Sequence, residues 1–172
     1  MEELTETVVK AAFDYAIDSI SNLTSGWDSK LKSKFKSSFN TYINETCKHC
    51  SIVYNLINKN NPSNLSDVYI EPPFYFYTDK NKYTSFKSFD PFEKHNSILI
   101  KGTAGLGKST LCKYLYLHFV KKNKGGIPLF FELKHINNSK LTLWEFIIKE
   151  LKLTGVSINT EHILQLFKSG KF

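Results

Sequence analysis

The sequence contains no arginine, so all of its 23 positively charged side chains are lysines. Arginine is the preferred side chain for bidentate reading of base edges, and it supplies the charged finger that stabilises many phosphoryl-transfer reactions. The chain therefore brings no arginine finger of its own. Although the net charge is +7, we do not expect direct recognition of nucleic acid and interpret the lysines as a solvated basic surface.

Long apolar runs and a secretory signal are also missing. No stretch of about eighteen apolar residues is present, and Glu2 and Glu3 stand where a signal peptide needs a basic start. We therefore expect a cytoplasmic protein with no membrane partner. Cys47, Cys50 and Cys112 are too few for a disulfide framework. Cys47 and Cys50 have CxxC spacing, but a zinc site needs four ligands, so we expect them to pack in a core.

The first third of the chain has a helical pattern. Residues 1–30 hold six acids and two lysines, whereas residues 31–172 hold 21 lysines and ten acids. Apolar positions recur at helical spacing over about 1–25 and again over 31–57. We predict an N-terminal helical domain over 1–66 in which the two helices form an antiparallel hairpin. Its expected task is contact with a protein partner or self-association.

A connector is predicted over 67–96. A breaker cluster rich in asparagine precedes it, and Pro72 and Pro73 restrict the runs around them to edge strands at most. The aromatic run Phe74 to Tyr77 has two interpretations. It could cover an adenine ring or stack on single-stranded bases, or it could seal the junction between the helical part and the following domain, which we favour.

From residue 97 the pattern alternates between strand and helix. We predict strands over 97–101 and 127–133 and helices over 109–122, 143–151 and 162–167. This order predicts an α/β domain over 97–172 with a parallel sheet.

The motif GxxxxGKS lies between the first strand and the first helix of this domain. Glycines let the chain curl so that backbone N–H groups point at a phosphate, and the helix adds its positive end. Lys108 would reach the β- and γ-phosphates, and Ser109 would offer its hydroxyl to Mg²⁺. Thr110 would either lie near the α-phosphate or simply begin the helix. The predicted ATP-binding residues are Gly102, Thr103, Ala104, Gly105, Leu106, Gly107, Lys108, Ser109 and Thr110.

Two segments after this loop point to a family. Gly126 to Lys134 spells GIPLFFELK, and Leu141 to Ile147 spells LTLWEFI. With the loop, these resemble the start of a NACHT module, a branch of the signalling STAND ATPases related to the AAA+ fold. Tyr69 to Pro72 also looks like the short piece that precedes many bacterial NACHT modules. The resemblance implies an ATP-controlled switch with an N-terminal output domain, and in bacteria often a role in defence against phages.

One family feature is missing. No run of apolar residues followed by Asp-Asp or Asp-Glu comes after the loop, and Glu132, Glu145, Glu150 and Glu161 all stand in the wrong context for a Walker B acid. We therefore expect the front part of a longer protein, truncated in its nucleotide domain, with weak or no turnover. The alternatives are a fragment of an AAA+-like motor ATPase and a non-hydrolysing adaptor that acts through its helices. ATP versus GTP stays open.

Overall fold

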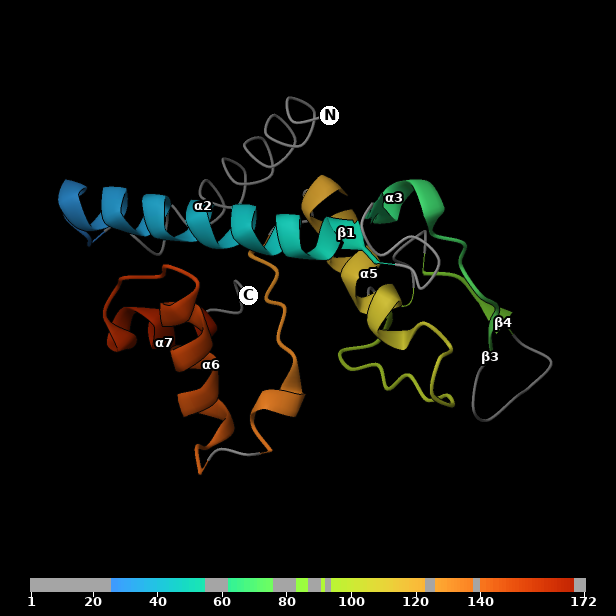
Figure 1. Ribbon diagram of the computed structural model, residues 1–172. Coiled ribbons are helices and arrows are strands. Elements are labelled where there is room, and N and C mark those ends of the chain that lie inside the picture. Colours follow the sequence, from blue (N-terminus) through green and yellow to red (C-terminus); the bar gives the residue numbers. More distant parts are fainter. Residues whose placement is uncertain are drawn as a thin grey trace. The chain divides into compact units, whose positions relative to one another are not determined.

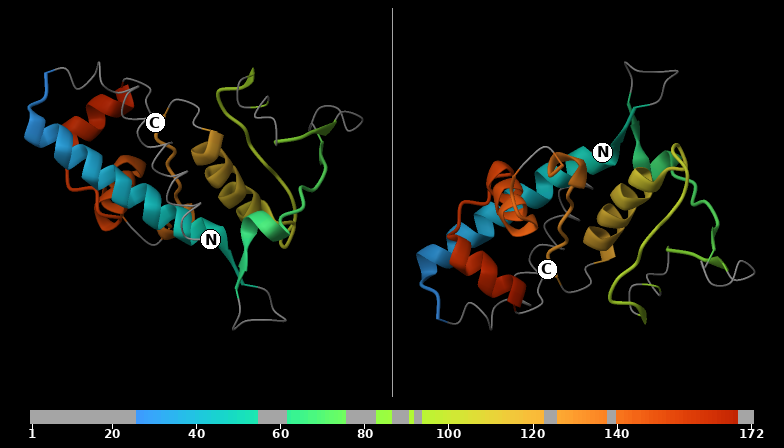
Figure 2. Two further views of the ribbon diagram at one scale, coloured as in Figure 1. Left: turned by 90° about the horizontal axis from the view of Figure 1, so that it is seen from above. Right: turned by 90° about the horizontal axis from the view of Figure 1, so that it is seen from below.

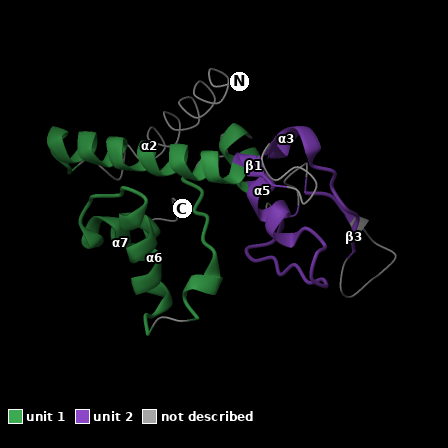
Figure 3. Cartoon of the chain, viewed as in Figure 1, with its two compact units in different colours: residues 1–50, 116–172 green, residues 51–115 purple. Residues whose placement is uncertain are grey.

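The computed structural model describes residues 26–54, 62–75, 83–86, 91, 94–122, 126–137 and 140–168. The chain packs as two compact units, one made of residues 1–50 and 116–172 and the other of residues 51–115 (Figure 3). The predicted first helix over 1–25 lies outside the described residues. The predicted domain bounds 1–66, 67–96 and 97–172 stay a prediction, and the two compact units divide the chain differently.

Helix α2 (Ser29–Ser51) is the longest described element of the first unit (Figure 1). It begins after Asp28, whose Oδ1 accepts the backbone N–H of Leu31 at 2.6 Å and so caps the first turn. Its buried positions, among them Phe35, Phe39 and Tyr42, recur every three or four residues. This is the second of the two predicted helices, and it ends six residues before the predicted limit at Ile57 because Ile52 begins a strand.

Helices α6 (Leu143–Leu153) and α7 (Thr160–Lys168) confirm the two helices predicted near the end of the chain. A capping box begins α6: the Thr142 side chain accepts the backbone N–H of Glu145, whose carboxylate accepts the N–H of Thr142. After α6 the chain turns at Gly155, whose φ of 95° suits glycine best. Both helices lie beside α2 in Figures 1 and 2.

The core of the first unit joins α2 to residues far along the chain. Aromatic and aliphatic side chains from both parts are buried together; those from α2 include Phe39 and Ile43, and those from the C-terminal part include Leu151 and Ile163. Burying each such side chain contributes about 1.5–3 kcal/mol. The Tyr42 hydroxyl adds a long-range hydrogen bond by accepting the backbone N–H of Phe130 at 2.8 Å. The second helix of the predicted hairpin, α2, therefore shares a core with the C-terminal helices α6 and α7.

The second unit contains short antiparallel ladders and a one-turn helix. Strand β1 (Ile52–Val53) pairs with β2 (Ser63–Asn64), and α3 (Leu65–Val68) follows at once, capped by the Asn64 side chain. Strand β3 (Phe74–Tyr75) pairs with β4 (Tyr83–Thr84). The second pairing confirms an edge strand after the prolines and places another strand, β4, within the predicted connector over 67–96.

The parallel sheet predicted over 97–172 is not formed among the described residues. Residues 97–103 and 127–132 are in neither helix nor strand. The short 3₁₀ helix η1 (Leu133–His135) comes directly after the second of these two segments. A strand exists only where a neighbour accepts and donates its ladder hydrogen bonds, and no described segment does so here. Leu99, in the middle of the predicted strand over 97–101, is 79% exposed. The described fold is thus a mixture of helices and small antiparallel ladders.

Candidate phosphate-binding loop

The predicted loop residues lie where an irregular segment turns into a helix. A turn occupies Ala104 and Gly105, a bend occupies Leu106 and Gly107, and α5 (Lys108–Lys122) begins directly afterwards. This start agrees with the predicted helix over 109–122. Residues 102–107 are all exposed. The nine residues are therefore neither a continuous strand nor a continuous helix, but a turn that leads into a helix.

Two glycines permit this turn. Gly105 has a φ of 83° and Gly107 a φ of 75°, in the left-handed region that costs other residues about 1–2 kcal/mol. A Cβ added at Gly102 would lie 3.0 Å from Cδ1 of Leu106, the end of an exposed side chain that can move aside. Of the two glycines that define the motif, Gly107 thus occupies a left-handed backbone position, and Gly105 between them occupies another.

The ammonium group of Lys108 closes the loop on itself. Its Nζ donates to the carbonyl oxygen of Gly102 at 2.9 Å and to that of Thr103 at 2.7 Å. The positive charge is therefore held close to the turn by the carbonyl oxygens of the first two residues of the motif. Sequence reasoning assigned Lys108 to phosphate oxygens but missed these two carbonyl contacts, for which the spacing of the motif gives no signal.

The first turn of α5 adds unsatisfied N–H groups to this positive charge. The carbonyl of Gly107 accepts the N–H of Leu111 at 2.8 Å, so the amides of residues 108–110 precede the first helical hydrogen bond. No acidic side chain lies in this turn, although an anion is favoured there. Ser109 is exposed and Thr110 is half-buried, both within the first turn. Thr110 is thus part of the beginning of the helix, which was one of its two predicted positions.

An aromatic stack connects α5 to the segment before β3. The rings of Tyr69 and Tyr114 lie parallel, with centroids 4.0 Å apart and an interplanar angle of 20°. Burial, and next the negative charge of Glu71, raise the pKa of Tyr69 to about 12. Sequence reasoning singled out Tyr69 but could not find its partner, because the contact joins residues that are 45 positions apart.

Glu71 binds the chain beyond the next hairpin. Its Oε1 accepts the backbone N–H of Phe86 at 2.7 Å, and its Oε2 accepts the Ser85 hydroxyl at 2.6 Å. Phe86 is buried and meets Phe74 edge-on, with ring centroids 4.8 Å apart. These two aromatic side chains pack against each other within their own unit. The sealing role favoured from the sequence stays a prediction.

The cysteines and Glu132, which were also considered as candidates, make packing contacts or ion pairs. Cys47 and Cys50 are buried in α2, as predicted, and burial raises the pKa of the Cys47 thiol to about 12. Glu132 forms an ion pair with Lys134, which lowers the pKa of that carboxyl. Within the described residues, no group of three or more histidine, cysteine or acidic side chains is placed to hold a metal, and no helix combines the length and apolarity needed to cross a bilayer.

Comparison with known proteins gives no match. No protein-family model matches the chain, and neither a curated protein nor a solved structure does so. Any function of the chain must therefore be inferred from the loop itself.

Proposed function

We propose that the chain binds the phosphates of ATP, with Mg²⁺, through residues 102–110. The observation that carries this proposal is the GxxxxGKS sequence folded as a turn with two left-handed glycines, across which Lys108 reaches back at the start of a helix. A segment that matched the motif only by chance would not be expected to combine these features. Exposed amides, a fixed ammonium group and a helix N-terminus free of acids together favour a polyphosphate.

Each part of the loop would have a distinct role with the nucleotide. Backbone N–H groups near Gly105 and Gly107 would surround the β-phosphate, and Lys108 would contribute a point charge to the β- and γ-phosphates. The exposed Ser109 hydroxyl fits a hard, oxygen-preferring cation. When bound, Mg²⁺ neutralises phosphate charge. Glu132, which is paired with Lys134, has no role in this proposal.

At the level of the whole protein, we propose the front part of a NACHT-like signalling NTPase that acts in the cytoplasm, with antiviral defence as its setting. In such a domain the segments around 98–100 and 127–132 would belong to a parallel α/β sheet. The support is the motif, the two family-like segments after it, and the helix that starts at Lys108. The activity proposed for residues 102–110 is nucleotide binding.

Metal-dependent binding tests the proposed site. Titration of the purified chain with ATP should give tighter binding with Mg²⁺ than with a chelator. Ser109→Ala should remove this difference, a loss of about tenfold in affinity for one hydrogen-bonding ligand to a charged group, while binding without Mg²⁺ persists. Ser97→Ala, which removes an exposed hydroxyl of the same unit outside the loop, provides the control. Equal Mg²⁺ dependence in wild type and Ser109→Ala would defeat the assignment of Ser109.

A non-hydrolysing adaptor is the second candidate, and the core shared by α2, α6 and α7 favours it. Such a core can present a helical surface whether or not nucleotide is bound. Size-exclusion chromatography with and without ATP and Mg²⁺ separates the two candidates. A stable oligomer that is indifferent to nucleotide supports the adaptor, whereas a nucleotide-dependent change supports the switch.

A further inference from the structure

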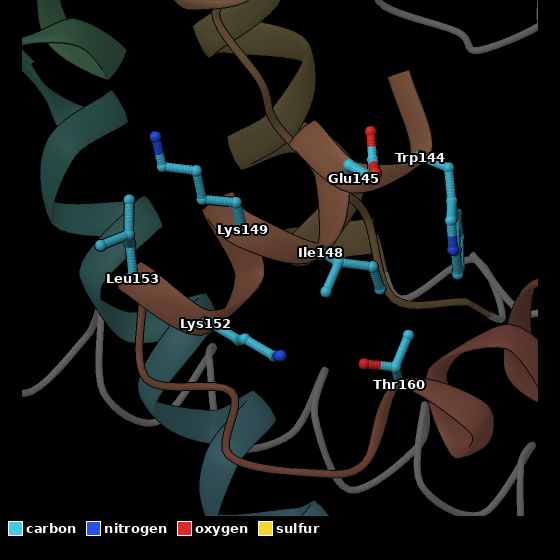
Figure 4. A pocket seen from close by; sticks show the side chains of 7 residues that line it. All are labelled: Trp144, Glu145, Ile148, Lys149, Lys152, Leu153 and Thr160. Carbon is cyan, nitrogen blue, oxygen red and sulfur yellow. The ribbon is translucent and has the colours of Figure 1, made fainter. Parts of the chain in front are cut away.

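A pocket of about 430 Å³ opens along α6, next to the first residue of α7 (Figure 4). Its lining is mainly apolar, and six of its seven lining residues come from α6. All of them belong to the first compact unit. The pocket is thus separate from the phosphate-binding loop, and the proposed function makes no use of it.

The apolar part of the pocket is formed by Trp144 and Ile148. Ile148 is buried at the base, and Trp144 is half-buried. The indole is held by Phe167 of α7, which meets it edge-on with centroids 5.1 Å apart. This contact fixes one wall of the pocket, so an apolar side chain entering it would meet a surface that needs little rearrangement.

The charged part of the pocket is positive. The Lys152 ammonium group and the Thr160 hydroxyl point toward one another across the pocket (Figure 4), and Lys149 lines it as well. Neither lysine forms an ion pair with a described residue. Glu145 is the one acid in the lining; its Oε2 accepts the N–H and hydroxyl of Thr142 at 2.8 and 2.9 Å, and the carboxylate keeps its negative charge. The two lysines therefore outnumber the single acid.

We propose that this pocket binds an acidic peptide segment of a partner protein. A carboxylate of the peptide would lie between Lys152 and Thr160, and a neighbouring apolar side chain would lie against Trp144 and Ile148. Charge complementarity argues for this occupant, because two lysines against one acid line a mainly apolar pocket. An apolar base with a basic rim suits a peptide that alternates acidic and apolar residues.

The test is fluorescence anisotropy with a labelled, end-blocked peptide of about twelve residues made of glutamate and leucine. We expect binding that weakens with salt and falls about tenfold in Lys152→Gln, the loss of one charged contact. Lys168→Gln, an exposed lysine in the last turn of α7, should bind as wild type does. Both changes are at exposed positions, so folding should not be affected.

Three results would overturn the proposal. One is equal binding by wild type and Lys152→Gln. The second is equal binding of a peptide in which glutamine replaces every glutamate, which would mean that the acid is not recognised. The third is tighter binding of dodecanoate than of the peptide, which would identify a site for a small amphiphile. None of these three results bears on ATP binding, because the experiment contains no nucleotide.

Discussion

Replacing Gly105 should weaken nucleotide binding in a graded way that follows backbone conformation. At a φ of 83°, alanine costs about 1–2 kcal/mol, asparagine costs less and valine costs more. A Cβ at Gly105 would meet nothing within 4 Å, so the penalty comes from the backbone alone. Because the loop is exposed, the free variant can relax to a negative φ, and the cost then appears in binding.

A penalty of about 1–2 kcal/mol corresponds to a loss of roughly 5- to 30-fold in affinity for Gly105→Ala. Titration with a fluorescent ATP analogue measures it, and thermal unfolding shows whether part of the cost falls on stability instead. Gly26→Ala is the matched control, since Gly26 has no positive φ and no neighbour within 4 Å of an added Cβ. If all three Gly105 variants bind as wild type does and unfold at its temperature, the left-handed turn is not the binding conformation.

Two further predictions concern the stability of the first unit. Gly155→Ala should lower the free energy of unfolding by about 1–2 kcal/mol, because Gly155 has a φ of 95°. The new Cβ adds a further cost, since it would lie 3.1 Å from Cγ2 of Thr41. Urea unfolding of the double variant with Thr41→Ser should show that only this further cost is relieved. Tyr42→Phe should cost about 1–3 kcal/mol, because it leaves the N–H of Phe130 without its acceptor at 2.8 Å; an unchanged unfolding midpoint would show that this hydrogen bond contributes nothing.

The helices could be predicted from the sequence because their signals are local. The capping box at Thr142, the glycine after α6 and the three-to-four spacing in α2 each fix a conformation through neighbours within a few residues. The start of α5 was predicted in the same way from the motif. Where the helices pack could not be predicted, because the contact between Tyr42 and Phe130 joins residues 88 positions apart.

The strands were predicted less well for a physical reason. Apolar runs such as residues 98–100 predict a buried strand only if other strands are present to cover and pair with them. Such a run carries no information about whether its neighbours are there. Among the described residues no neighbouring strand pairs with this run, so Leu99 is exposed. The residues of the candidate site were predicted from the spacing of the motif. The contacts of Lys108 with the carbonyls of the loop and the Tyr69–Tyr114 stack could be found only in the structure, because the sequence motif does not specify them.

The most direct test of the central claim is equilibrium binding of ATP and Mg²⁺ to Lys108→Ala, compared with wild type and with Lys94→Ala. The control removes the same charge at an exposed position of the same unit. We predict that Lys108→Ala loses detectable binding, because the positive charge that the carbonyls of Gly102 and Thr103 hold at the loop is gone. Lys94→Ala should bind as wild type does. Binding of similar affinity in all three proteins would contradict it.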